Sequence, residues 1–84
     1  MKLSKAQIES MQEDLVAEML SVLMEQKNLS MENAMLLLYN SDTFARLQDV
    51  QSGLYYQSVG YVMDCLENEI TAYIVAIRAT MMSF

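Results

Sequence analysis

The chain of 84 residues contains no histidine, tryptophan or proline, and it has only one cysteine and two glycines. Without histidine, the Ser-His and Cys-His pairs of nucleophilic enzymes and all histidine-containing metal sites are excluded. Glycine-rich phosphate loops are missing as well. The lone Cys65 cannot form an internal disulfide, and a cysteine in the middle of a helical pattern is typical of packing. We therefore expect a protein that is not an enzyme and that has no catalytic, cofactor-binding or metal-binding residues.

Basic residues are also scarce, since five of them face eleven acidic residues and the net charge is −6. They are scattered along the chain as Lys2, Lys5, Lys27, Arg46 and Arg78. An acidic chain repels phosphate groups, which disfavours nucleic acids and anionic membranes as partners. The apolar stretch 72–77 is far shorter than the roughly 18–20 residues of a membrane span, and no signal-peptide pattern is present. These features predict an acidic, cytoplasmic protein with no nucleic-acid or membrane partner.

The near absence of helix breakers, combined with a hydrophobic fraction of 54%, predicts a folded helical chain. Residues 1–84 are long enough for one domain, in which roughly 60% of the surface of the unfolded chain becomes buried. Such a small core gives modest stability, so self-association is expected.

Four serines mark the expected beginnings of helices, because serine is a favoured N-cap residue. Ser4, with Gln7 three residues later, forms a capping box before a helix over residues 5–26. Ser30 and Ser41 precede two short helices, over residues 31–39 and after residue 41, and Ser58 precedes a long last helix. The sequence thus predicts an all-α fold, a compact bundle of four helices, two long and two short. We expect the first and last helices to pack together while the short pair closes the core.

The last helix carries two apolar surfaces. The first is a stripe about six turns long that we expect to face the core. It consists of Val59, Val62, Met63, Leu66, Ile70, Tyr73, Ile74, Ile77 and Met81. The second lies on the opposite side and consists of Ala72, Val75, Ala79 and Met82. A monomer would least readily expose this second strip, so it is the candidate interface of a homodimer.

The segment 52–58 places Gly53, Tyr55 and Tyr56 between two helical patterns. Gly53 is expected to adopt a positive φ, and of the two adjacent tyrosines one should anchor the core while the other stays accessible. An echo of this pattern seventeen residues earlier brings in further aromatic residues. The resulting candidate binding corner is Tyr39, Phe44, Tyr55, Tyr56 and Tyr61. Two readings are open: a binding unit used twice, or the same helix-starting device used twice, which we favour.

The run 39–44 (YNSDTF), followed by Leu47, residues 53–58 (GLYYQS), Tyr61, Val62 and Leu66, resembles a group of short bacterial helical proteins of unknown function. These proteins are associated with toxin–antitoxin or mobile-element neighbourhoods. The likeness covers about residues 15–70. It implies a compact helical domain of bacterial origin with an antitoxin-like or regulatory binding role, and it assigns no function to any residue.

Nine methionines add to the expectation of a binding protein, because methionine suits surfaces that repack against several shapes. The sequence predicts a protein–protein interaction module, with a second copy of itself as the first partner. The alternative is a small-molecule or peptide-binding domain that uses the Tyr55/Tyr56 corner. A pocket lined by Tyr39, Phe44, Tyr56 and Tyr61 would favour that class. A DNA-binding regulator is the third possibility, and it would require the basic residues to cluster on one face.

Overall fold

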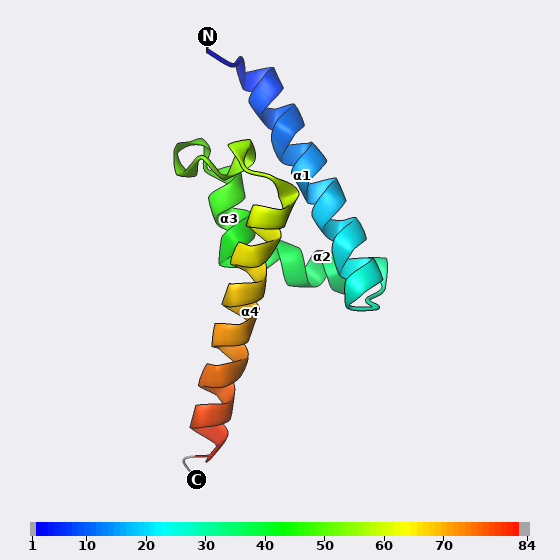
Figure 1. Cartoon of the computed structure of the whole chain (residues 1–84), viewed down its shortest axis with the longest axis vertical. Helices are drawn as coiled ribbons and strands as arrows, with labels where there is room; N and C mark the ends of the chain where they lie inside the picture. The colour runs from blue at the N-terminus through cyan, green and yellow to red at the C-terminus, as the bar shows by residue number, and fades with distance from the viewer. Residues whose placement is uncertain (1, 83–84) are drawn as a thin grey trace.

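A computed structural model describes residues 2–82 and shows an all-α chain, with no strand in that range. The four helices are α1 (Lys5–Gln26), α2 (Met31–Tyr39), α3 (Asp42–Gln48) and α4 (Val59–Met82), as Figure 1 shows. Two short 3-10 turns, η1 (Val50–Ser52) and η2 (Leu54–Tyr56), connect α3 to α4.

The helix beginnings are those that the serines predict. The Ser4 hydroxyl accepts a hydrogen bond from the Gln7 amide, and the Gln7 side chain accepts one from the Ser4 amide, which completes the capping box. Ser30, Ser41 and Ser58 each accept a bond from the amide three residues further on. Gly53 adopts the expected left-handed conformation with φ 74°. These features are confirmed because each depends on residues that are close in sequence.

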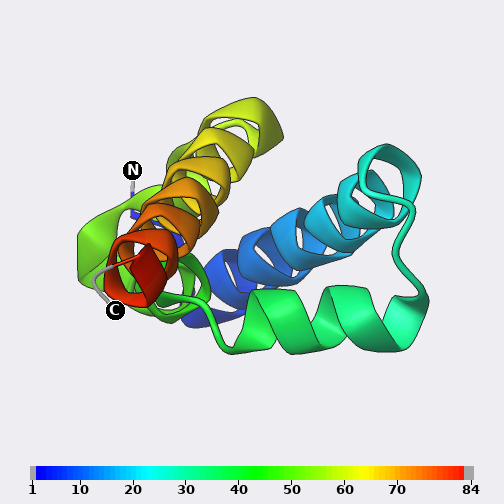
Figure 2. The same cartoon turned by 90° about the horizontal axis from the view of Figure 1, so that it is seen from below.

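The core lies between the four helices and is closed at one end by the η2 turn. Its fully buried side chains come from every α-helix, and the largest are Met19, Leu23, Leu38, Leu47, Val62 and Leu66. Seen from below, α1 and α2 meet on one side of the molecule, while α3 and α4 lie on the other (Figure 2). Contacts between α1 and α4 exist, but α1 packs more extensively on α2, and α4 packs more extensively on α3. The predicted pairing of the first and last helices is therefore a secondary contact.

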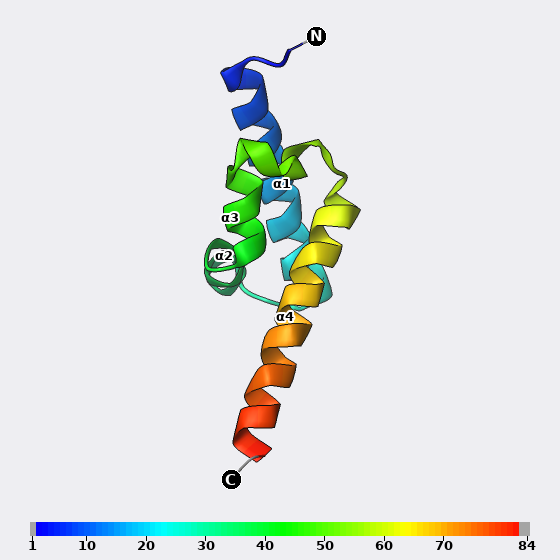
Figure 3. The same cartoon turned by 90° about the vertical axis from the view of Figure 1, so that its left-hand side faces the viewer.

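The second half of α4 extends beyond this body, as Figures 1 and 3 show. The chain measures 55 × 26 × 18 Å and has a radius of gyration of 14.6 Å, whereas a compact domain of this length would have one of about 12 Å. Every residue from Thr71 to Met81 is exposed. We call residues 71–82 the arm. A single copy of the chain is thus more extended than the compact bundle that the sequence predicts.

The expectation that the apolar stripe of the last helix faces the core along its whole length is wrong for the arm. Its members there, Tyr73, Ile74, Ile77 and Met81, are 41–71% exposed. Periodicity tells which side of a helix is apolar, but it does not tell how far the neighbouring helices reach. At 1.5 Å per residue, α4 is about 36 Å long and α3 only about 10 Å, so α4 extends past the end of α3.

Candidate functional site

The arm begins at a polar clamp between α4 and α3. The Glu69 carboxylate accepts hydrogen bonds from the amides of Asp42 (2.8 Å) and Thr43 (2.9 Å) and from the Thr43 hydroxyl (2.7 Å). The Ser41 hydroxyl accepts from the next amide, that of Phe44. The first three amides of α3, which no residue within the helix can satisfy, therefore all have acceptors. This clamp fixes the direction in which the arm leaves the body.

The pKa of Glu69 reflects its position in the clamp. Partial burial raises the pKa, because it disfavours the charged form. The hydrogen bonds from Asp42 and Thr43 lower it, and so does the positive charge of Arg46. The lowering effects prevail, so the pKa of Glu69 lies below its ordinary value of 4.5. Glu69 is ionised at neutral pH and places a negative charge at the positive end of α3.

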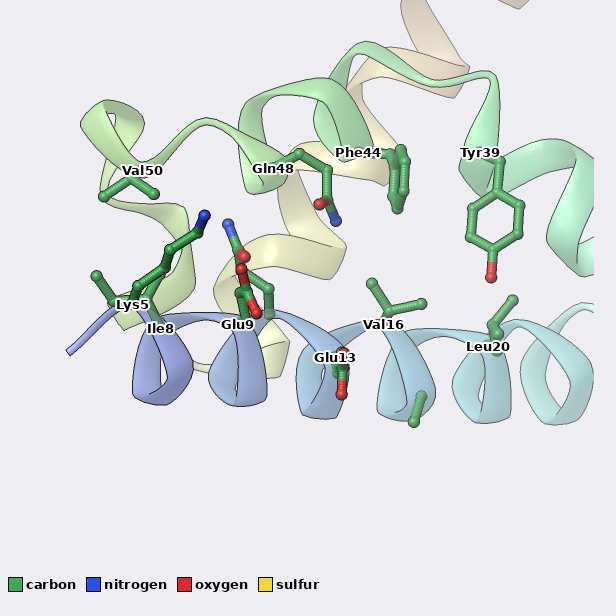
Figure 4. A pocket seen from close by; sticks show the side chains of 12 residues that line it. Lys5, Ile8, Glu9, Glu13, Val16, Leu20, Tyr39, Phe44, Gln48 and Val50 are labelled. Atoms are coloured by element: carbon green, nitrogen blue, oxygen red, sulfur yellow. The ribbon is translucent and has the colours of Figure 1, made fainter. Parts of the chain in front are cut away.

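A groove of about 1040 Å³ lies between α1 and the segment that runs from the end of α2 through α3 to η1 (Figure 4). Ile8, Val16 and Leu20 line it from α1, and Tyr39, Phe44 and Val50 line it from the facing segment. Two carboxylates, Glu9 and Glu13, and the ammonium group of Lys5 lie along the α1 side. The groove therefore combines apolar walls with a rim that carries one net negative charge.

One buried hydrogen bond joins the two walls of this groove. The Gln12 side chain donates to the Leu47 carbonyl at 2.9 Å, and Gln12 is itself buried. The carbonyl belongs to the last turn of α3, where no helical amide can reach it. This contact ties α1 to α3 and holds the walls at a fixed separation.

The structure divides the predicted aromatic corner into separate places. The rings of Tyr39 and Phe44 contact each other, with centroids 4.9 Å apart, and both line the groove. Tyr55 and Tyr56 form a second pair, with centroids 4.3 Å apart, and neither lines the groove. Tyr61 is also exposed outside it. The described pockets that Tyr39 lines contain neither Tyr56 nor Tyr61.

The expectation that Tyr55 and Tyr56 differ in burial is confirmed. Tyr55 is 6% exposed and belongs to the core, whereas Tyr56 is 60% exposed. A hydrogen bond with the Tyr56 side chain raises the pKa of Tyr55, and burial and the charge of Tyr56 add to the same shift. The pair thus has one anchoring and one accessible member.

The arm presents two apolar faces to solvent. One continues the core stripe and carries Tyr73, Ile74, Ile77 and Met81. The other is the strip predicted as an interface. Its residues Ala72, Val75 and Ala79 are exposed, and the side chain of Met82 lies outside the described part of the chain. On a wheel of 100° per residue, the polar residues Arg78 and Thr80 separate the two faces.

A second hollow lies at the base of the arm, between α2 and α4. It has a volume of about 650 Å³, and Leu36, Leu66, Ile70 and Tyr73 are among its lining residues. Leu36 and Tyr73 are both more than 60% exposed, so this hollow is open to solvent. It connects the apolar surface of the arm with that of α2.

The other site classes receive no support from the described residues. Lys27 pairs with Glu67 at 3.1 Å, and Lys5, Arg46 and Arg78 lie on α1, α3 and the arm, so the basic residues belong to different elements. Within residues 2–82, no three histidine, cysteine or carboxylate side chains gather closely enough to hold a metal ion. In that same range, no helix has both the length and the apolar character that crossing a membrane requires.

Comparisons of the chain with protein-family models, with curated proteins and with solved structures found no match.

Proposed function

We propose that the protein is a protein–protein interaction module that associates with a second copy of itself through the arm. The observation that carries this proposal is the continuous exposure of residues 71–81, most of which are apolar. Contiguous apolar surface of this kind marks interaction sites in proteins. The sequence resemblance to short bacterial proteins suggests the same class of role, antitoxin-like or regulatory, and a cytoplasmic location stays a prediction from the sequence.

A partner would also stabilise the helical conformation of the arm. Most helical stability in proteins comes from the packing of an apolar face, and the apolar side chains of the arm are exposed. Burial of a large apolar side chain contributes about 1.5–3 kcal/mol, and five such side chains on the arm are 41–71% exposed. Burying the exposed half of each would stabilise a dimer by on the order of 10 kcal/mol for two arms. That is comparable with the roughly 4–15 kcal/mol that association costs, so both arms have to take part.

The strip of Ala72, Val75, Ala79 and Met82 is suited to contact between two copies of α4. Its alanines allow two helices to approach closely, and a two-fold axis would use the same strip twice. In this arrangement the compact four-helix architecture predicted from sequence is a property of the dimer, because each arm gains the neighbours that its own chain does not supply.

The test is the oligomeric state of Val75→Glu compared with the unaltered chain. Val75 is 60% exposed, so the substitution leaves the core intact. We expect the unaltered chain to be a dimer at micromolar concentration and Val75→Glu to be a folded monomer, as measured by light scattering after size-exclusion chromatography. Asn68→Glu is the matched control, because it adds the same charge to an exposed position of α4 outside the arm. A monomeric unaltered chain, or a Val75→Glu variant as dimeric as the control, would contradict the proposal.

A peptide-binding function is the second candidate, and the groove between α1 and α3 is the observation that favours it. Its apolar walls and its position between helices are typical of sites that receive an amphipathic helix. Its aromatic residues are Tyr39 and Phe44, so the binding corner would be this pair and not Tyr55 and Tyr56. The two candidate functions converge if the helix that the groove receives belongs to a second copy.

A further inference from the structure

We propose that the groove between α1 and α3 receives the arm of a second copy, and that two copies exchange arms reciprocally. This inference rests on the proposed self-association and specifies its contact. The apolar face formed by Tyr73, Ile74, Ile77 and Met81 is the part of the arm that enters the groove. In this exchange the two arms lie at opposite ends of the dimer, so the contact in the groove takes the place of a contact between the two α4 strips.

Length is the first argument for this occupant. The groove follows α1 from Lys5 to Leu20, a distance of about 22 Å at 1.5 Å per residue. The arm of residues 71–82 is about 18 Å long by the same measure. Figure 4 shows side chains from both walls pointing into the space between α1 and the facing segment. The arm is therefore no longer than the groove.

Chemistry is the second argument. The walls offer Ile8, Val16 and Phe44 to the apolar face of the arm. The rim has one net negative charge, from Glu9 and Glu13 against Lys5, while Arg78 is the only charged residue of the arm. Arg78 lies beside the apolar face and therefore at the level of the rim when that face is inserted. The arm and the groove thus complement each other in both polarity and charge.

The arm alone is too small to form a stable dimer interface. Half of the lateral surface of a helix 18 Å long is on the order of 300–400 Å², which is what each copy would bury if the arms paired only with each other. A stable interface buries about 800 Å² on each partner. Reciprocal exchange approaches that area, because each copy buries one arm and one groove.

The shape of the chain permits this exchange. The arm extends from one end of the molecule, and the first half of α1, which lines the groove, lies at the other end (Figure 1). Two copies placed side by side in opposite directions bring each arm next to the groove of the other copy. A two-fold axis across the long dimension generates both contacts at once.

Intermolecular paramagnetic broadening tests the position of the arm directly. A nitroxide spin label is attached to the cysteine of a Cys65→Ala/Thr80→Cys variant that has natural isotope abundance. This variant is mixed with 15N-labelled chain that carries no nitroxide. Only contacts between copies are then observed. We expect broadening of the amides of Val16, Leu20 and Phe44. Broadening confined to α4 or to the hollow near Leu36 would overturn the groove as the docking site and leave self-association standing. A monomer at all concentrations would overturn both.

Replacing each of two glutamines by arginine provides an independent test in which Cys65 is unchanged. Gln48 is exposed and lines the groove, so Gln48→Arg adds bulk and a positive charge to the wall that the arm would contact. Gln51→Arg is the matched control, because Gln51 is exposed on η1 and does not line the groove. With two grooves per dimer and about a tenfold loss at each, Gln48→Arg should raise the dimer Kd on the order of 100-fold, whereas Gln51→Arg should leave it unchanged. Equal Kd values for the two variants would refute the exchange.

Discussion

Removal of the Glu69 carboxylate is the sharpest test of how the body holds α4. In Glu69→Ala, the two amides and one hydroxyl that donate to this carboxylate lose their acceptor. Thr43 is only 1% exposed, so water cannot easily replace the carboxylate at that residue. The variant leaves polar groups unsatisfied at the point where the arm begins.

The magnitude follows from the number and type of these bonds. A hydrogen bond to a charged group contributes about 1.5–3 kcal/mol, and a negative charge at a helix N-terminus adds about 0.3–1 kcal/mol. The three bonds share one carboxylate and are not additive, and the partial burial of Glu69 offsets part of their effect. We therefore expect Glu69→Ala to lower the free energy of unfolding by about 2–4 kcal/mol. For a domain of this size, that corresponds to a decrease in Tm of roughly 10–30 °C.

Thermal unfolding followed by circular dichroism measures this change at one fixed protein concentration, since association also affects Tm. Glu67→Ala is the matched control on the same helix. Its carboxylate pairs with Lys27 at 3.1 Å, but both side chains are about one-third or more exposed. Such pairs contribute about 0–1 kcal/mol. If Glu69→Ala were no more destabilising than Glu67→Ala, the clamp would have no role in stability.

The stabilisation by Glu69 also has a defined pH dependence. Its folded-state pKa is lowered, so its contribution is complete above its ordinary pKa of 4.5 and is lost as the pH falls through the folded-state pKa. The difference in unfolding free energy between the unaltered chain and Glu69→Gln should therefore be constant near neutral pH and shrink below about pH 4.5. Other carboxylates cancel in this difference. A difference that persisted at low pH would show that the ionised carboxylate is not the cause.

Two further predictions concern the connection between α3 and α4. Ser58→Ala should lower the free energy of unfolding by about 0.5–2 kcal/mol, because α4 loses its cap. Gly53→Val should also destabilise the chain, because valine disfavours a φ of 74°. Unchanged denaturation midpoints in both variants would disprove this account. Tyr55→Ala should cost about 3–5 kcal/mol because it opens a cavity in the core, whereas Tyr56→Ala should cost less than about 1 kcal/mol. Equal losses in urea denaturation would mean that both rings support the core.

The helix boundaries could be predicted from the sequence because their determinants are local. Each serine cap bonds an amide three residues away, and the left-handed turn depends on Gly53 alone. Of the binding corner, Tyr39 and Phe44 come together because they flank a single short connection between α2 and α3. Local patterns therefore determine both the elements and this aromatic contact.

The contacts that position the arm and the groove could not be predicted in the same way. Glu69 bonds residues 26 and 27 positions earlier, and Gln12 bonds a carbonyl 35 positions later. In the sequence, Glu69 is one of several acidic residues on a helix and Gln12 is one polar residue on a long helix. A weak signal for Gln12 exists, because it lies close to the apolar stripe of Ile8, Leu15 and Met19. Only the path of the chain shows which partners these side chains meet.

The same limit explains why the periodicity of the last helix predicts a buried position for the arm. The stripe through Tyr73 and Ile77 has the periodicity of a core-facing helix, yet these side chains are 68% and 41% exposed. Sequence periodicity records the need for a neighbour without specifying which chain provides it. Because most helical stability in proteins comes from the packing of an apolar face, a neighbour that buried the arm would also stabilise its helical conformation. In the proposed dimer, folding of the arm and association of the two copies would be coupled, and the structural feature that points to this coupling is an apolar stripe that extends past the packed part of its own chain.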